Sequence, residues 1–409
     1  MVIDLLKHTV VNVCKSVTYG MKKPDRKFFR TYLESMLEYR TTVLSRLGDR
    51  KKVDACNLLK YFSRNLAKES FTCLQDRVFG VMRKFVGKLD ANARFCFDSV
   101  DLNKYSAKKM EGISKVRDGS TGRIVNGYVL NAVSVKGIPI MLEREELEDG
   151  DEGKTTRFDI FTLQVMKILA NFWSGYWILA DRLYDDVKKF NLLITQGFRF
   201  VIRVKTYRDV TILSGWTAEW EKEWKWKTLK VGDIPEWSYQ ITFNKLLKPC
   251  YLSVYRHPKC KKPIRVLSNE PDTKMVERYL KRWEIERIFK SGKQEFELEK
   301  IGTTSKQKID NLIAIVQLCL GISAYVYGHL EREASESNIV TKWKATVSAV
   351  TFRKELKAYL KRVSLTFNRN SIISFIAEYM KKVRKMKYFL NWVTLRPLNS
   401  SQLCLEFGC

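Results

Sequence analysis

The order of short apolar runs between residues 94 and 205 constrains the fold of this chain most strongly. Three strand-like runs come first and are followed by a segment of helical spacing, a compact apolar run, a second helical segment and a last strand-like run. In sequence these are ARFCFDSVDL, RIVNGYVLNAVSV, IPIMLEREE, Thr155 to Ala170, YWILAD, residues 184–196 and FRFVIRVK. Lys136-Gly137 joins the second and third runs and is a hairpin signal. The order therefore predicts a mixed sheet with helices packed on it.

This order of strands and helices is that of the ribonuclease H-like fold, although other mixed sheets share parts of it. Before it, residues 1–90 show apolar residues at helical spacing among basic ones. After it, residues 206–272 hold five tryptophans and short alternating runs, which indicates a β-rich insertion. Helical patterns return from Asp272 to the end. We therefore predict an α/β chain: a ribonuclease H-like mixed sheet flanked by helices, with a β-rich insertion and helical N- and C-terminal regions.

The charge of the chain indicates a polyanionic partner. Lys and Arg number 74 against 45 Asp and Glu, a net charge of +29. A folded protein with such an excess attracts phosphates, because neutralising them releases condensed counterions. The excess extends over both ends, since residues 1–90 carry 19 basic and 9 acidic residues and residues 330–409 carry 15 and 6. Nucleic acid is the favoured partner; an anionic membrane surface, an RNA-packaging role and a lysine-rich soluble enzyme are the alternatives.

Cysteine, histidine and the apolar segments bear on the compartment. The nine cysteines form no CxxC pair and there are only three histidines, so structural zinc lacks its usual ligand spacing. The odd count fits reduced thiols in a cytosol. Asp4 and Lys7 interrupt any signal peptide, which favours a cytoplasmic protein. Residues 311–330 are long enough to span a bilayer, but Asn311, Gln317 and other polar residues interrupt them and favour a buried core helix without membrane contact.

Two aspartates interrupt the apolar strands. Asp98 follows Phe97 in the first predicted strand, and Asp181 closes the fourth. A carboxylate is expensive to bury unless it is paired or binds a metal. The first and fourth strands are neighbours in a sheet of this order, so both side chains could face one site and hold Mg²⁺ or Mn²⁺ through oxygen. An ordinary aspartate at a strand end fits each position taken alone.

The segment YLKRWEIERIFKSGK, residues 279–293, carries a second polar group. At 100° per residue, Tyr279, Arg282, Glu286 and Lys293 fall within about 60° on one face of one helix. An apolar stripe borders that face, so the helix could pack on the sheet and point Glu286 at the two aspartates. A solvated charged helix fits the same spacing equally well.

The spacing of these four residues resembles the YREK signature of DDE transposases from bacterial insertion sequences, specifically the insertion-sequence-four family. ILADRLYDD resembles the segment of that family that holds its second aspartate, and FDSVDL the segment that holds its first. The resemblance covers about residues 90–330. It implies that three acids are catalytic and bind two Mg²⁺ or Mn²⁺ ions, and that three further residues contact DNA. The acids are Asp98, Asp181 and Glu286, and the DNA-contacting residues are Tyr279, Arg282 and Lys293.

The resemblance also implies an activity: cut-and-paste transposition, with hydrolysis at terminal inverted repeats, a hairpin intermediate and strand transfer into target DNA. It implies a homodimer in the synaptic complex, located in the bacterial cytoplasm on nucleoid DNA. A flipped base stacked on one of the tryptophans between Trp216 and Trp237 is consistent with it, as is core packing of each of these residues. Asp101 is an alternative first ligand to Asp98, and Lys104 could touch phosphate or be simply solvated.

Two other functions remain open at this point. One is a domesticated transposase that binds DNA without cutting it, and the other is a different ribonuclease H-like nuclease. Under the favoured prediction the regions are a helical N-terminal DNA-binding region (1–90), the first part of the catalytic core (91–205), a β-rich insertion domain (206–272), the second part of the core (273–330) and a basic helical C-terminal region (331–409).

Overall fold

The computed structural model describes residues 2–336, except residues 40, 45–54, 106, 108, 147–148, 151–152, 173, 216–223 and 257–261. Residues Leu5–Glu333 form one compact unit. The predicted basic C-terminal region, from residue 337 on, lies outside the described residues, as do Trp216 and Trp220.

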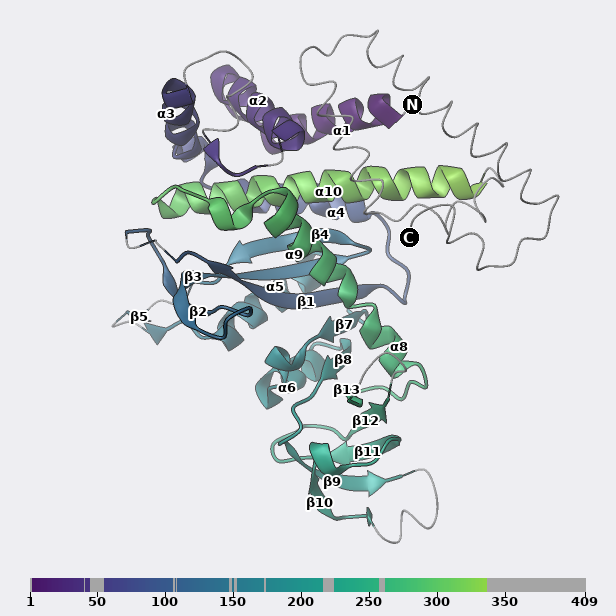
Figure 1. Cartoon of the computed structure of the whole chain (residues 1–409). Coiled ribbons are helices and arrows are strands. Elements are labelled where there is room, and N and C mark those ends of the chain that lie inside the picture. Colours follow the sequence, from purple (N-terminus) through teal and green to yellow (C-terminus); the bar gives the residue numbers. More distant parts are fainter. Residues whose placement is uncertain are drawn as a thin grey trace, which may run out of the picture. The chain divides into compact units, whose positions relative to one another are not determined.

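A mixed sheet of eleven strands forms the centre of this unit (Figure 1). Its order is β10-β9-β11-β12-β13-β8-β7-β1-β3-β2, with β4 also paired to β3. The strands are β1 (Arg94–Asn103), β2 (Ser114–Arg117), β3 (Ile124–Val135), β4 (Ile138–Arg144), β7 (Trp177–Ala180), β8 (Arg199–Arg203), β9 (Asp209–Ser214), β10 (Thr228–Lys230), β11 (Ser238–Thr242), β12 (Cys250–Tyr255) and β13 (Ile264–Ser268), and a separate ribbon is formed by β5 (Asp149–Gly150) and β6 (Gly153–Lys154).

The neighbours of β1 in the sheet pair antiparallel with it on one side and parallel with it on the other. β1 pairs antiparallel with β3, and β3 pairs antiparallel with β4. On its other side β1 pairs parallel with β7, which pairs parallel with β8. All four residues of β7 are buried and apolar, as expected of a parallel strand covered on both faces. The predicted neighbourhood of the first and fourth apolar runs is therefore confirmed.

The predicted hairpin between β3 and β4 is also present. Lys136 and Gly137 both have positive φ, at 53° and 73°. Positive φ at both central residues is what a two-residue turn needs to match the twist of the strands it joins. Glycine supplies that conformation at position 137 without steric cost.

The segment from 206 to 272 is rich in strands. β9 to β13 pair antiparallel with one another, and β13 pairs with β8. These strands therefore extend the central sheet beyond β8. Buried residues such as Ile212, Ile241 and Leu252 continue the hydrophobic core into this segment.

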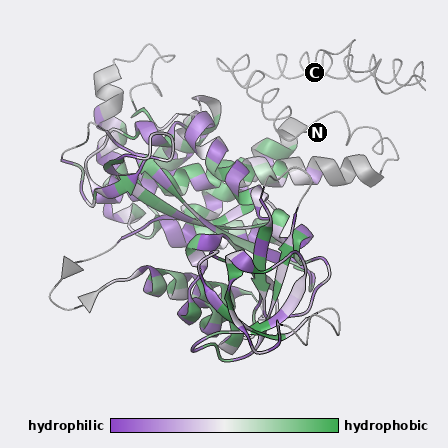
Figure 2. Ribbon diagram, turned by 60° about the horizontal axis from the view of Figure 1, so that its bottom comes forward, coloured by the Kyte–Doolittle hydropathy of each residue, from purple (hydrophilic) through white to green (hydrophobic). Residues whose placement is uncertain are grey.

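Helices cover the sheet, and Figure 2 shows hydrophobic residues concentrated in the strands and mixed with hydrophilic ones on the helices. α5 begins with a complete capping box between Thr156 and Asp159, and Asp186 caps α6. The helices are α1 (Val2–Val17), α2 (Lys23–Tyr39), α3 (Ala55–Leu66), α4 (Leu74–Val86), α5 (Arg157–Asn171), α6 (Val187–Thr195), α8 (Met275–Leu280), α9 (Trp283–Glu295) and α10 (Lys306–Glu336), with short 3₁₀ turns η2 (Glu69–Phe71), η3 (Arg182–Tyr184), η4 (Val231–Asp233) and η5 (Leu298–Lys300).

The long helix α10 contains the apolar segment that is long enough for a membrane span. Among the described residues it is the one such helix, and 78% of its apolar window is buried inside the protein. Two polar residues within it bond buried backbone: Asn311 Nδ2 donates to Leu66 O at 2.8 Å and Gln317 Nε2 donates to Ile140 O at 2.8 Å. The prediction of a buried core helix is confirmed for this segment.

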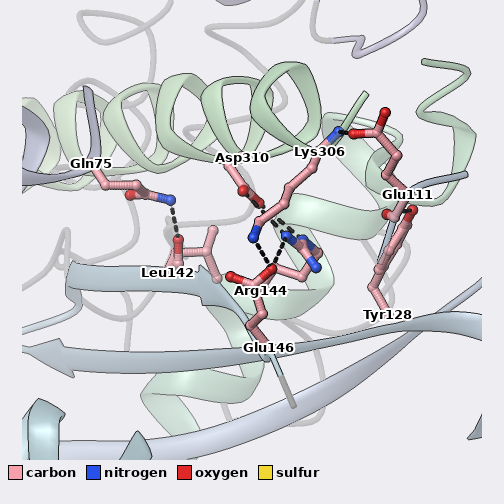
Figure 3. Close-up of polar contacts among 8 residues, drawn as sticks. All are labelled: Gln75, Glu111, Tyr128, Leu142, Arg144, Glu146, Lys306 and Asp310. Atoms are coloured by element: carbon pink, nitrogen blue, oxygen red, sulfur yellow. Dashed lines mark hydrogen bonds and ion pairs between the residues drawn. The ribbon is translucent and has the colours of Figure 1, made fainter. Parts of the chain in front are cut away.

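A buried arginine fixes α10 to the sheet (Figure 3). The Arg144 side chain is 2% exposed and its Nε lies 3.0 Å from Asp310 Oδ1. Arg144 Nη2 also lies 3.2 Å from Glu146 Oε1, and Lys306 pairs with the same glutamate. At the start of α10, Lys306 N donates to Glu111 Oε2 at 2.8 Å. A buried guanidinium needs such partners, because an unpaired buried charge is strongly unfavourable.

Replacing Asp310 by Asn should lower the free energy of unfolding by about 1–3 kcal/mol, because a buried arginine loses a charged acceptor. Denaturant titration followed by circular dichroism measures this change. Asp209→Asn is the matched control, since its partner Lys230 is 57% exposed and the pair is screened by water. An equal loss in both variants would contradict the structural role assigned to Arg144.

Candidate active site

Asp98 and Asp181 lie side by side where the parallel pairing of β1 with β7 ends. In the register of β1 and β7, Phe97 is paired with Ala180. The next residues along the chain are Asp98 and Asp181, so they occupy adjacent positions. Asp98 is 8% exposed, and its Oδ1 accepts a bond from Ser99 N at 2.9 Å. Sheet pairing thus brings together two carboxylates that are 83 residues apart.

The helix carrying the third acid differs from the sequence prediction. Instead of one helix through 279–293, the chain forms α8 and α9 with a junction at Lys281 and Arg282. Across the junction the backbone bonds run three residues back, with Arg282 N to Tyr279 O at 2.9 Å and Ile285 N to Arg282 O at 3.0 Å. Such 3₁₀-type bonding tightens the turn and changes how side chains on the two sides align. The prediction that residues 279–293 form one continuous helix, with the four side chains on one face of it, is therefore wrong.

Across this junction the side chains still converge on the aspartates. Helix α8 packs against β7, β8 and β13, and α9 packs against β1 and β3. Tyr279 Oη donates to Asp181 Oδ1 at 3.1 Å. Arg282 Nη1 lies 2.6 Å from Asp98 Oδ2, and Arg282 Nη2 lies 2.6 Å from Glu286 Oε1. One guanidinium therefore joins the first strand acid to the helix acid.

Burial and charge set the electrostatics of this group. Desolvation raises the pKa of Asp98 to about 6; the Arg282 charge opposes this rise, and Asp181 and Glu286 add to it. Burial would by itself lower the pKa of Arg282, but Tyr279 and the two aspartates outweigh it and hold that pKa above its usual value. Desolvation, followed by the Asp181 charge, raises the pKa of Tyr279 to about 12. Asp181 and Glu286 thus act on the charge of Asp98, and all three carboxylates act on the Arg282 cation.

A pocket of about 530 Å³ opens beside this group, between β1 and α9. Asp98 and Glu286 line it, and Lys290, Lys293 and Glu299 border it. Glu286 is open to this space, with its side chain 52% exposed. The pocket gives a substrate access to two of the three acids.

Lys293, the last residue of the YREK-like set, contacts other residues than Tyr279, Arg282 and Glu286 do. Its Nζ donates to Asp101 O at 2.6 Å and pairs with Glu299 Oε1 at 2.9 Å. It lines the same pocket as Asp98 and Glu286. The structure therefore gathers Tyr279, Arg282 and Glu286 directly around the aspartates and holds Lys293 at the border.

Lys104 has a structural position. It is 7% exposed, and its Nζ donates to the carbonyls of Glu299 at 2.6 Å and Ile301 at 3.0 Å. Burial lowers the pKa of this lysine to about 8. Lys104 is therefore neither solvated nor available to phosphate, because its ammonium donates to backbone carbonyls of the η5 loop.

Three other acids lie close to Asp98 or Asp181 in the sequence, and the structure places them outside the acidic group. Asp185 is 4% exposed, accepts a bond from Lys205 N at 2.7 Å and pairs with Arg208. Asp186 caps α6. Asp101 follows Asp98 by three residues, so its side chain points to the other face of β1. Only the position after β7, and not the acid-rich composition of ADRLYDD, distinguishes Asp181.

The donor set suits a hard divalent cation, which prefers carboxylate oxygen. In the present arrangement Arg282 lies between Asp98 and Glu286. Within the part of the chain that is described, no three acidic, histidine or cysteine side chains are grouped closely enough to hold a metal ion. The chemistry of Asp98, Asp181 and Glu286 therefore fits a metal, provided that Arg282 leaves its place between two of them.

Comparison with known proteins bears on the family. Residues 120–322, about half of the chain, match the family model described as a transposase DDE domain. This part of the chain is therefore similar to a transposase DDE domain. The matched range contains Asp181 and Glu286 but begins after Asp98, so the grouping of Asp98 with these two acids rests on the β1–β7 pairing and on its bond to Arg282.

Other comparisons add little to this assignment. No curated protein matches the chain. Among solved structures, a cryo-EM structure of the piggyBac transposase synaptic complex with hairpin DNA is similar at 13% identity and a TM-score of 0.46, covering 92% of this chain and 82% of that one. A structural similarity of this size is too weak to assign the fold or the function.

The tryptophans of the strand-rich segment from 206 to 272 differ in exposure. Trp226 is 68% exposed and Trp237 is 43% exposed. Trp224 is half-buried against the core. Among the described tryptophans of the segment, Trp226 and Trp237 therefore present aromatic surface to solvent.

Replacing Lys104 by Met should lower the melting temperature, because backbone carbonyls of the η5 loop lose their donor, at a cost of about 1–3 kcal/mol. Thermal unfolding followed by circular dichroism measures the effect. Lys109→Met, at an exposed position nearby, should leave the melting temperature unchanged. If both variants melt at the wild-type temperature, Lys104 does not hold the loop.

Proposed function

We propose that this protein is a DNA transposase that cuts and rejoins DNA with Asp98, Asp181 and Glu286 as its catalytic acids. One observation carries the proposal: residues from β1, β7 and α9 are joined around the buried guanidinium of Arg282 and the hydroxyl of Tyr279. Of these residues, Tyr279, Arg282 and Glu286 belong to the set, with Lys293, whose spacing resembles the YREK signature of the insertion-sequence-four family. The match of residues 120–322 to the transposase DDE domain supports the same class of enzyme.

The sheet supports the finer assignment of the fold. Strands β4, β3, β1, β7 and β8 lie in that spatial order, the first two antiparallel to their neighbours and the last two parallel to β1. This is the arrangement of a ribonuclease H-like core. In it the first and fourth strands place their acids together, which is the position of Asp98 and Asp181.

The residues of the site have distinct roles in the proposed reaction. Two Mg²⁺ or Mn²⁺ ions, when bound by Asp98, Asp181 and Glu286, supply a Lewis acid for phosphodiester displacement. Arg282 then turns its guanidinium to the phosphates beside the scissile bond, where a planar fork can bind two oxygens. Its Nε is buried without a hydrogen-bond partner in the described structure and is a further donor for such a contact.

Lys293 and Tyr279 complete the contact with DNA. Lys293 lies at the border of the pocket beside Asp98 and binds phosphate as a point charge. Tyr279, 3% exposed, keeps Asp181 in place through its hydroxyl and packs under the guanidinium of Arg282, whose Cζ lies 5.4 Å from its ring centre. No protein nucleophile is required, since the attacking group is water or a DNA hydroxyl.

The proposed biological setting follows from the same resemblance. The substrates are double-stranded terminal inverted repeats and target DNA, and the net charge of +29 favours such a partner. We propose cut-and-paste movement of an insertion sequence by a homodimer in the cytoplasm of a bacterium, on nucleoid DNA. An exposed tryptophan, Trp226 or Trp237, is the candidate for stacking a flipped base.

Replacing Asp98, Asp181 or Glu286 by its amide should abolish nicking of a plasmid that carries the element ends, by at least about a hundredfold, since each is a charge-bearing ligand of the reacting centre. Binding to the same DNA, measured by gel shift, should remain, because phosphate contacts elsewhere hold the complex. Glu284→Gln, on the same helix, is the control and should cut normally. A normally cutting variant at any of the three acids would remove that acid from the site.

Lys293→Ala should slow hairpin formation and strand transfer by about tenfold, because a phosphate contact at the border of the site is lost. A gel assay that separates nicked, hairpin and joined products measures each step. The melting temperature should stay close to that of the wild type. A fall in melting temperature as large as that of Lys104→Met would instead assign Lys293 to the packing of the η5 loop.

The plasmid experiment also separates the remaining alternatives. A wild-type protein that binds element ends with Mg²⁺ present and never nicks them is a DNA-binding descendant of a transposase. Cleavage without strand-transfer products indicates another nuclease of the ribonuclease H-like type. The intact set of three acids around one cation favours the active transposase.

A further inference from the structure

A second pocket, of about 430 Å³, lies against the other face of β1. Helix α5, helix α6 and the β2–β3 hairpin surround it, and we name it the α5–α6 pocket. Its basic residues are Lys115, Arg117, Arg157 and Lys189, its acids are Asp101 and Glu145, and Gln164 and Asn131 add amides. Four basic against two acidic side chains leave it with an excess of positive charge.

Lys189 is the unusual member of this pocket. It is 7% exposed, and within the described residues its ammonium makes no hydrogen bond or ion pair. Its nearest partners are aromatic faces, with Nζ 4.7 Å from the ring centre of Tyr184 and 5.4 Å from that of Phe161. Its Nζ is not itself fully buried and lies at the pocket, where an ammonium offers three donors to a ligand that carries oxygen acceptors.

Gln164 adds a second buried group without a partner. It is 4% exposed, and its Nε2 has no hydrogen-bond partner in the described structure. It lies two helical turns after Arg157 on α5, and both residues line the pocket. Buried polar atoms are seldom left unsatisfied, so this amide beside the ammonium of Lys189 indicates a polar ligand.

The acids of the pocket do not cancel its basic character. Glu145 accepts a bond from Arg157 Nε at 2.8 Å and another from Asn131, so it positions Arg157 at the rim. Asp101 is half-buried, and its backbone carbonyl binds Lys293. Lys189 is left as the buried cation without such a partner, next to an arginine that is 64% exposed.

The position of the pocket identifies its ligand. Ser99 and Asp101, which line it, alternate along β1 with Asp98, and Leu183 and Tyr184 follow Asp181 by two and three residues. Successive strand residues are about 3.3 Å apart, so the pocket begins within a few ångströms of the proposed reaction centre. A DNA strand bound at the proposed reaction centre would therefore pass close to this pocket.

We propose that the α5–α6 pocket binds a backbone phosphate of the DNA substrate, with Lys189 as its buried cation and Arg157 and Gln164 as further donors. The inference rests on the proposed function, since it assigns the ligand as DNA. It adds a phosphate site on the face of the sheet opposite α9, formed by residues outside the acidic group and the signature helix.

The test measures the salt dependence of DNA binding by the full-length protein without divalent metal. Fluorescence anisotropy with a duplex oligonucleotide from about 50 to 200 mM KCl gives the slope of log K against log salt. Lys189→Gln should reduce that slope by about 0.9, the contribution of one phosphate contact to duplex DNA. Lys189→Arg should restore it.

Lys188→Gln is the matched control, because it removes the same charge from the neighbouring, exposed position of α6. It should keep the wild-type slope. If Lys189→Gln melts far below the wild type, Arg157→Gln gives the same test from an exposed residue whose loss does not open the core. A wild-type slope in both Lys189→Gln and Arg157→Gln overturns the phosphate site. A wild-type protein without any salt-dependent binding overturns the proposed function instead.

Discussion

The candidate site depends on the buried guanidinium of Arg282. It lies between Asp98 and Glu286 at 2.6 Å from each, and Tyr279 beneath it holds Asp181. Removing one partner from such a buried group leaves an uncompensated charge, which is costly. The helix acid therefore stays close to the strand acids without a metal ion. The proposed function therefore requires that Arg282 leave its place between Asp98 and Glu286, after which it can bind phosphate.

Two features of the fold place this interaction. Parallel pairing of β1 with β7 aligns the aspartates at adjacent strand positions. The tight junction between α8 and α9 then lets α8 contact β7, β8 and β13 while α9 contacts β1 and β3. The chain between β8 and α8 continues the sheet through β9 to β13, so a long stretch of sequence is accommodated without separating the two halves of the site. Helix α10 is fixed to β4 by the pair of Arg144 and Asp310.

Much of this could be predicted from the sequence because the signals were local. The strand order, the Lys136–Gly137 hairpin and the neighbourhood of Asp98 and Asp181 follow from apolar periodicity and turn chemistry, and the structure contains them. The break at Lys281 and Arg282 could not be predicted, since helical spacing continues through it and the tightening comes from tertiary packing. The role of Lys104 was also hidden, because its carbonyl partners lie almost 200 residues further along the chain. The buried Lys189 gave no signal at all: in sequence it is one of two adjacent lysines, and only the fold distinguishes them.

The most direct test of the account is the position of Mn²⁺ in crystals of the protein, located by anomalous scattering. The account predicts manganese bound by oxygens of Asp98, Asp181 and Glu286, with Arg282 displaced from between the acids. Crystals soaked in Mn²⁺ at saturating concentration that show no peak among these carboxylates, and an Arg282 still bridging Asp98 and Glu286, would contradict it.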